Sequence, residues 1–154
     1  MNRMNRRTAS CRPAAAAEIR GSDEFPTLRG SVRFYPVNGG SLVTARIFGL
    51  PKSSPFAAMH IHNGKSCTGS REDNFADAGT HLNLSDSEHP LHTGDLPALM
   101  NSGGSAYIAF VTDRFTPGQV IGYPVVIHRS ADDYHTQPSG GSGTKIGCGI
   151  IRAL

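Results

Sequence analysis

Alternation of apolar and polar residues is the clearest pattern in this chain. It runs through residues 28–35 and resumes over residues 41–48, after the tight-turn sequence Asn38-Gly39-Gly40. Because side chains of a strand point alternately to its two faces, this pattern predicts two half-buried strands joined as a hairpin. Further short strands are predicted over residues 14–20, 56–62, 96–100, 106–111, 125–128 and 145–151.

Two long segments without a regular pattern interrupt these strands, over residues 63–94 and 131–144. Loops of that length within a compact domain usually carry function. The chain has 18 glycines and 10 prolines in 154 residues, no tryptophan and little helical periodicity. These features predict an all-β fold, an eight-stranded antiparallel barrel or sandwich with two long functional loops.

The formal net charge of +3 is concentrated at the amino terminus. Four arginines lie within the first twelve residues, and the rest of the chain has eleven Lys and Arg against twelve Asp and Glu. A nucleic-acid-binding protein is expected to show a basic face, which this balance does not predict. We therefore predict a disordered tail over residues 1–13, a single domain over residues 14–154 and no nucleic-acid partner.

The tail contains fragments of two export signals. Arg6-Arg7 is similar to a twin-arginine signal, and the sequence from Thr8 to Cys11 is similar to a lipoprotein cleavage site. Both signals require an apolar segment of about 7–15 residues, and none precedes Cys11. The chain as given is thus predicted to carry neither an export signal nor a transmembrane span. The compartment is therefore left open: the cell envelope if a misplaced start codon has removed a signal, and otherwise the cytoplasm.

Histidines are the main candidates for chemistry. Six of the seven fall within residues 60–92 or at the end of a predicted strand: His60, His62, His81, His89, His92 and His128. A lone histidine is more often a core or surface residue, but neutral imidazole is also the commonest ligand for copper and zinc. His60 and His62 share one face of a strand, and His89, His92 and Asp95 recur every three residues in a loop. This pattern predicts metal binding, with a second ion in the loop.

These motifs, taken in order, resemble those of the copper/zinc superoxide dismutases, from about residue 14 to residue 154. The resemblance rests on Gly49-Leu50-Pro51, Met59-His60-Ile61-His62, Cys67, Ala78-Gly79-Thr80-His81, His92-Thr93-Gly94-Asp95-Leu96, Val126-Ile127-His128, Ala131-Asp132-Asp133 and Gly147-Cys148-Gly149-Ile150-Ile151. The compact segment His89-Pro90-Leu91-His92 is most similar to bacterial members. The resemblance implies a Greek-key barrel, one copper and one zinc as cofactors, and superoxide as substrate.

The resemblance also implies a role for each site residue. The copper ligands would be His60, His62, His81 and His128, and the zinc ligands His81, His89, His92 and Asp95. His81 would bridge the two metals and take up a proton when the copper is reduced, and Asp132 would link His60 to His89. By the same comparison, His135 matches no ligand position and Asp133 is a solvated loop acid.

The resemblance also concerns a lysine and a pair of cysteines. The family usually has an arginine three residues before its second cysteine, where this chain has Lys145. Lysine keeps the charge that attracts superoxide but lacks the planar fork of a guanidinium. The family also implies a disulfide between Cys67 and Cys148, although reduced thiols would be normal in a cytosol. Cys11 is left over and is interpreted as a thiol in the tail.

Non-enzymatic functions remain as alternatives. A copper carrier or a zinc-stabilised scaffold would keep the fold without turnover, and a purely structural protein would use only the sandwich. Degenerate relatives of the first kind lose a copper ligand, whereas all four copper positions are present here. The sequence therefore favours superoxide dismutation, and it leaves monomer and homodimer both open.

Overall fold

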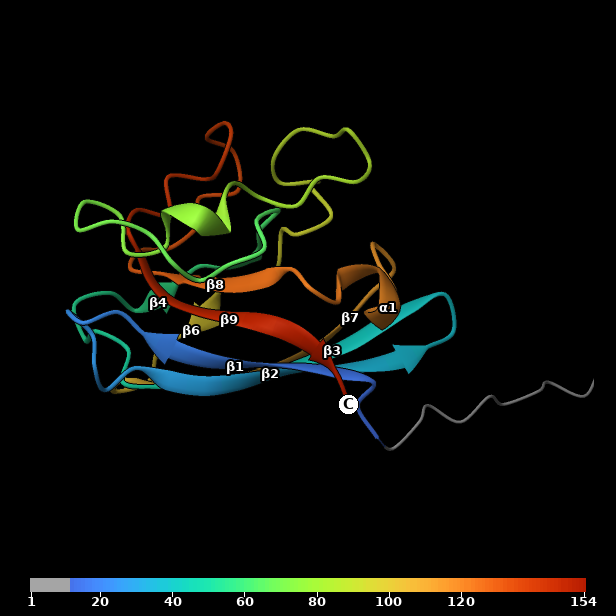
Figure 1. The fold of residues 1–154 in the computed structure, drawn as a ribbon, viewed down its shortest axis with the longest axis horizontal. Coiled ribbons are helices and arrows are strands. Elements are labelled where there is room, and N and C mark those ends of the chain that lie inside the picture. Colours follow the sequence, from blue (N-terminus) through green and yellow to red (C-terminus); the bar gives the residue numbers. More distant parts are fainter. Residues whose placement is uncertain (1–11) are drawn as a thin grey trace, which may run out of the picture.

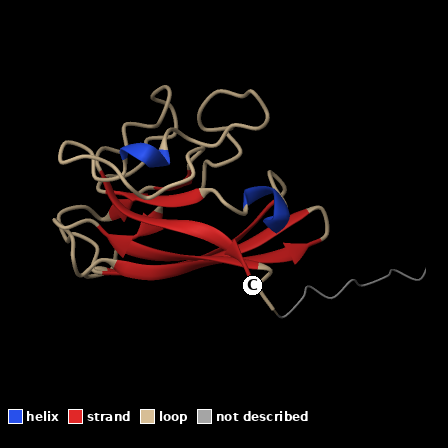
Figure 2. Ribbon diagram, viewed as in Figure 1, coloured by secondary structure: helices blue, strands red, loops and turns tan. Residues whose placement is uncertain are grey.

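The structure, a computed structural model, describes residues 12–154 (Figures 1 and 2). Most of the predicted tail, with Arg6, Arg7 and Cys11, lies outside the described residues. The described part contains nine strands, one α-helical turn and one 3-10 turn: β1 (Ala15–Gly21), β2 (Arg29–Val37), β3 (Gly40–Phe48), β4 (Phe56–Ala57), β5 (Met59–Ile61), η1 (Ala76–Ala78), β6 (Leu99–Met100), β7 (Ser105–Thr112), α1 (Pro117–Val120), β8 (Pro124–His128) and β9 (Lys145–Ala153).

One curled antiparallel sheet makes up most of the fold, in the strand order β5-β8-β9-β1-β2-β3-β7. The two remaining strands, β4 and β6, pair with each other and bridge the ends of this sheet. They can do so because only Ala58 separates β4 from β5, and because a turn closed by the Ser102–Ser105 bridge connects β6 to β7. With β4 and β5 counted as one interrupted strand, the predicted eight-stranded antiparallel barrel is confirmed.

The core of the barrel follows the alternation that predicted the strands. Val32 and Phe34 of β2 are fully buried, as are Val43 and Ile47 of β3, while their neighbours in sequence face outward. Phe115 closes one end of this core, with its ring centroid 6.1 Å from that of Phe34. Close packing of such side chains makes the barrel a rigid support for the loops.

Two elements differ from the predicted pattern. The strand predicted over residues 56–62 is interrupted at Ala58, because the Ala58 amide donates to Ser130 and its carbonyl accepts from His128. The turn α1 was not predicted, although its signal is present in the sequence. Thr116 and Gln119 form a capping box around a proline at the start of the turn.

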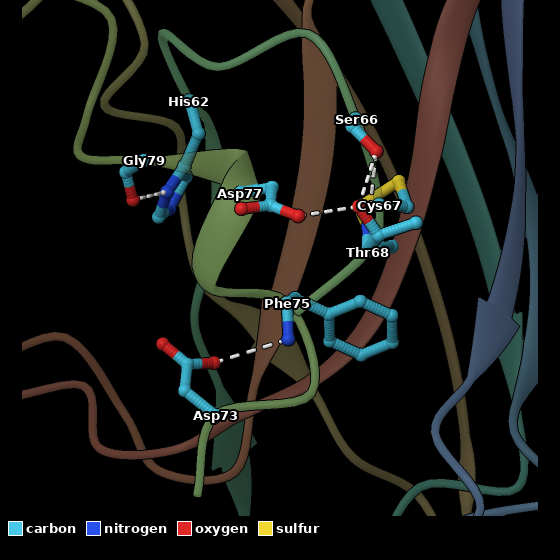
Figure 3. Close-up of a disulfide and its surroundings, with 9 residues drawn as sticks. His62, Ser66, Cys67, Thr68, Asp73, Phe75, Asp77 and Gly79 are labelled. Carbon is cyan, nitrogen blue, oxygen red and sulfur yellow. Dashed lines mark hydrogen bonds between the residues drawn. A yellow bond between two sulfur atoms is a disulfide. The ribbon is translucent and has the colours of Figure 1, made fainter. Parts of the chain in front are cut away.

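The two long loops gather over β8, on the side of the barrel away from β1 and β2 (Figure 1). The predicted disulfide between Cys67 and Cys148 is confirmed, with an S–S distance of 2.03 Å, and it ties the first loop to β9. Around it, Phe75, Ala78 and Val126 form a small apolar cluster separate from the main core. Figure 3 shows Phe75 and Cys67 on this loop. The disulfide and this cluster therefore anchor the loop to the sheet next to η1. No helix within residues 12–154 is long and apolar enough to cross a membrane.

Candidate metal centre

Seven buried side chains form two groups beneath these loops. In each group, one nitrogen or carboxylate oxygen per residue lies within 4.8 Å of the others, a spacing at which a single ion can be shared. The first group is His60, His62, His81 and His128, and the second is His81, His89, His92 and Asp95. His81 belongs to both, so the two groups meet at one imidazole ring.

Strands and loops contribute differently to the first group. His60 lies in β5, His62 follows it directly, and His128 ends β8, so three of the four residues are fixed by the barrel. His81 comes from the long loop, but backbone bridging between His62 and His81 holds it against the strand. The ring centroids of His60 and His81 are 3.9 Å apart. The sheet thus positions three histidines of this group, and the long loop supplies the fourth, His81.

Three nitrogens in these groups are buried without any hydrogen-bond partner: His60 Nδ1, His81 Nε2 and His92 Nδ1. His92 Nδ1 lies 3.2 Å from an oxygen of Asp95 but makes no hydrogen bond to it. A buried polar atom without a partner is costly, and lone pairs that converge in this way are what a cation satisfies. Four imidazoles suit copper, whereas three imidazoles and a carboxylate suit tetrahedral zinc. The residues present therefore fit both metals.

Asp132 connects the two groups by hydrogen bonding to one histidine of each. One of its oxygens lies 2.7 Å from His60 Nε2 and the other 2.9 Å from His89 Nε2. The Tyr134 amide also donates to Asp132 Oδ1, at 2.7 Å. Gly140 makes room for this arrangement, since a Cβ there would lie 1.9 Å from Asp132 Oδ1. Such a carboxylate fixes the orientation of both rings and leaves each Nδ1 facing the centre.

Backbone carbonyls orient the other two histidines. His62 Nδ1 donates to the Gly79 carbonyl at 2.8 Å, and His128 Nδ1 donates to the Gly143 carbonyl at 3.1 Å. The two Nε2 atoms then face each other, 3.2 Å apart. Both carbonyls belong to the long loops, so these loops set which nitrogen of each histidine is available as a ligand.

Burial keeps three histidines of the first group, His60, His62 and His128, neutral by lowering their pKa values. It lowers the pKa of His62 to about 2, with the nearby His128 acting in the same direction. It likewise lowers the pKa of His128 to about 3 and lowers that of His60. For Asp132, burial acts to raise the pKa, but hydrogen bonds from His60, the Tyr134 amide and His89 outweigh it and lower the pKa. Neutral imidazoles beside an ionised carboxylate are the protonation states that metal binding requires.

Comparison with known proteins agrees with this geometry. The family model for copper/zinc superoxide dismutase (SODC) matches residues 28–151. The chain belongs to the copper/zinc superoxide dismutase family. Similar family members include the superoxide dismutase [Cu-Zn] of Deinococcus radiodurans, which is 31% identical over 150 residues, covering 86% of this chain and 81% of the relative. Superoxide dismutase [Cu-Zn] 2 of Aquifex aeolicus is 30% identical, covering 80% of this chain and 78% of its own length.

Every residue that the resemblance marked as a ligand lies in one of the two groups, and His81 lies in both. His135 lies in neither group and its side chain is 80% exposed. Asp133 is also exposed, and it accepts hydrogen bonds from the amides of His135 and Thr136 within its own loop. It therefore shapes the loop without reaching the centre.

A cleft of about 780 Å³ opens from the first group to the surface. His62, His81 and His128 line its inner end, and Lys145 lies on its wall. Lys145 is the cross-strand neighbour of His128, which places its cation beside this group. Its Nζ donates to a carboxylate oxygen of Asp73, from the disulfide-anchored loop.

Two contacts at this centre were not predicted from the sequence. Besides the pairing of Asp73 with Lys145, Arg114 Nη1 lies 2.9 Å from the Pro90 carbonyl and 3.2 Å from each of the His92 and Asp95 carbonyls. Arg114 follows β7, remote in sequence from the loop that it holds. No local sequence pattern marks either contact, because both depend on segments that only the folded chain brings together.

Proposed function

We propose that this protein is a superoxide dismutase that uses one copper and one zinc ion. The observation that carries the proposal is the position of His81. Its Nδ1 lies 2.7 Å from Asp95 within the second group, and its Nε2 is buried without a partner and faces the first. One ring placed in this way would contribute a ligand to each of two ions, as expected for a centre with a bridging histidine.

In this proposal, copper is held by His60, His62, His81 and His128, and zinc by His81, His89, His92 and Asp95. Two features support this assignment: the types of ligand in each group, and the rigid strands and anchored loops that position them. Zinc has no redox chemistry, which suits the second group, where it would order the loop. The first group borders the open cleft, which suits the ion that meets the substrate.

Copper, when bound, supplies a one-electron couple, so that one superoxide is oxidised to oxygen and a second, with two protons, is reduced to hydrogen peroxide. Residues of the chain provide a proton acceptor, a positive charge for the anionic substrate, and alignment of the ligands. His81 Nε2 has no partner within the described protein and can hold and return one of these protons. Lys145 places a positive charge on the wall of the cleft, toward which an anion is drawn. Asp132 keeps His60 and His89 aligned throughout.

The test is a superoxide-consumption assay on protein loaded with copper and zinc, with both metals quantified in the same samples. His128→Ala should lose copper and activity and keep zinc, because His128 belongs only to the first group. His135→Ala is the matched control, since this histidine lies outside both groups and should leave metal content and activity unchanged. Full copper and full activity in His128→Ala would refute the assignment.

A copper carrier without turnover is a second candidate, favoured by one observation. Asp73 pairs with Lys145 and so opposes the charge that would attract superoxide. A carrier would exchange copper with a chelator but would consume at most one superoxide per copper. Catalytic consumption of superoxide in excess of the copper present excludes it.

A further inference from the structure

Five exposed arginines gather on the outer surface of one side of the barrel, and we call this surface the arginine face. Its members come from four neighbouring strands: Arg20 of β1, Arg29 and Arg33 of β2, Arg46 of β3 and Arg152 of β9. Pairing places Arg20 opposite Arg29, and places Ala16 between Arg33 and Arg152. Ser31, which shares a face with Arg29 and Arg33, lies opposite Arg46. The five side chains therefore share one surface.

Charge is strongly segregated on this surface. Its strands expose a single acidic residue, Glu18, between the arginines. The remainder of residues 14–154 has six Lys and Arg against eleven Asp and Glu. The near-neutral total predicted no basic surface, and that expectation is wrong. A total cannot reveal segregation, which here arises because alternate strand positions are brought onto one face by the register of pairing.

These arginines are not neutralised within residues 12–154. None of the five forms an ion pair there. Arg20 and Arg29 lie directly opposite each other on neighbouring strands, an arrangement of like charges that destabilises a sheet. Arg29 and Arg46 instead lie over aromatic rings, 5.9 Å from the centroid of Phe48 and 5.7 Å from that of Tyr107. An unpaired surface of this kind is complementary to an anionic partner.

A shallow trough of about 250 Å³ lies among these side chains, and its lining includes Arg20, Arg29 and Arg46 together with one carboxylate, that of Glu18. Gly30 lies in its lining, and a Cβ at this position would come within 2.2 Å of the Arg46 carbonyl. Guanidinium groups bind phosphate through parallel N–H donors, so three of them around a trough suit a phosphate group.

We propose that the arginine face docks on an anionic lipid surface. Four adjacent strands about 4.8 Å apart give a basic surface roughly 15 Å across, broad enough to contact several headgroups. Exposed apolar side chains adjoin it on β7, where Tyr107 is 63% and Val111 is 69% exposed. A bilayer surface accommodates this combination, taking cations at its phosphates and aromatic rings at its interface.

The same contacts disfavour a single-stranded nucleic acid as the partner. Such a partner binds by stacking its bases on exposed aromatic faces. Here the guanidinium groups of Arg29 and Arg46 already cover one face of Phe48 and one face of Tyr107. Docking through the arginine face would also leave the metal centre accessible, because the long loops lie on the side of the barrel away from β1 and β2 (Figure 1).

The test is flotation of the full-length protein with vesicles of phosphatidylcholine containing one-third phosphatidylglycerol, at low and high salt. The parent should float with these vesicles at low salt and not with pure phosphatidylcholine. In the variant Arg20→Gln/Arg29→Gln/Arg46→Gln, binding should fall about a hundredfold, since each basic residue near such a surface contributes roughly fivefold. High salt should release the parent by screening the attraction.

The matched control is Lys52→Gln/Arg71→Gln/Arg129→Gln, which removes three exposed cations from elsewhere and gives the same net charge. It should bind within about threefold of the parent. The arginines of residues 1–12 are common to all three proteins, so their effect cancels. The proposal is overturned if the parent does not bind anionic vesicles, if both triple variants lose binding equally, or if a single-stranded oligonucleotide at equal phosphate concentration binds more tightly than the vesicles.

Discussion

Lys145 donates a hydrogen bond from Nζ to a carboxylate oxygen of Asp73, across 72 positions of sequence. The Lys145 side chain is 16% exposed and that of Asp73 is 39% exposed, so the pair sits where the cleft meets solvent. Burial acts to raise the pKa of Asp73, but the hydrogen bonds from Lys145 and the Phe75 amide, together with the charge of Lys145, outweigh it and lower the pKa. Lys145, the cross-strand neighbour of His128, is therefore shared between an internal carboxylate and an incoming anion.

This pair predicts opposite effects for its two members. Asp73→Asn should free the cation and raise the superoxide-dismutation rate by up to about fivefold, the factor that corresponds to an exposed ion pair of ~1 kcal/mol.

Lys145→Glu should lower the rate by roughly tenfold at low salt, and the loss should shrink as salt screens the field. Lys145→Arg should hold or raise the rate. The measurement is rate against ionic strength at equal copper content. A Lys145→Glu protein as active as the parent at low salt would show that Lys145 does not guide the substrate.

Arg114 is predicted to hold the zinc-binding loop in shape. Its Nη1 lies within 3.2 Å of three carbonyl oxygens from residues in or beside the ligand set. Arg114→Met should leave those carbonyls without their donor and weaken zinc binding by about tenfold, a typical cost of losing support around a metal ligand. Zinc affinity measured by competition with a chelator provides the readout. Arg71→Met is the control, because Arg71 is an exposed loop arginine that donates to none of these carbonyls.

A role for Arg114 in loop order also predicts a change that needs no metal. In metal-free protein, Arg114→Met should speed proteolytic cleavage within residues 82–94, because the loop loses a tether to the segment after β7. Equal cleavage rates in Arg114→Met and Arg71→Met would contradict this role.

Gly140 is predicted to be required for the Asp132 link. An added Cβ would lie 1.9 Å from Asp132 Oδ1 and 2.8 Å from His89 Nε2. Gly140→Ala should therefore displace Asp132 and weaken retention of both metals by about tenfold or more. Gly141→Ala is the control for backbone strain, because Gly140 and Gly141 both have a positive φ, 70° and 61°. A Cβ added at Gly141 would meet only a carboxylate oxygen of Asp133 at 3.8 Å, which is an ordinary contact. Copper and zinc remaining after dialysis against a chelator are the measurement, and equal losses in the two variants would reject the steric explanation.

The metal-free protein should lose stability as pH falls below about 6.5. The folded-state pKa of His62 is about 2 and that of His128 about 3, whereas a histidine in the unfolded chain titrates near its ordinary pKa of 6.5. Between these limits the unfolded chain binds more protons, so the stability present above pH 6.5 declines toward pH 3, by at most about 1.4 kcal/mol per pH unit for each histidine. Melting temperature measured against pH tests this. His62→Gln should flatten the curve and His135→Gln should not, and a parent curve that is flat from pH 6.5 to 4 would be inconsistent with buried neutral histidines.

The sequence alone determined the strands and the inventory of ligands. Alternation in a strand is local, so the pattern over residues 28–35 and 41–48 sufficed to predict β2, β3 and the hairpin between them. The histidine motifs are local as well, since His60 and His62 share a face of any strand that contains them. Their order along the chain, with the two cysteines, was enough to indicate the family and the disulfide.

Tertiary structure alone decided how these pieces act on one another. The distance between Asp132 and His60, the capture of Lys145 by Asp73, and the reach of Arg114 to the zinc-binding loop each join residues that no periodicity relates. The arginine face likewise exists only because antiparallel pairing sets β1, β2, β3 and β9 in one register. A sequence pattern is produced by neighbours along the chain, whereas the charge and hydrogen bonding at a site are produced by neighbours in space, and loop closure and strand register determine which residues those are.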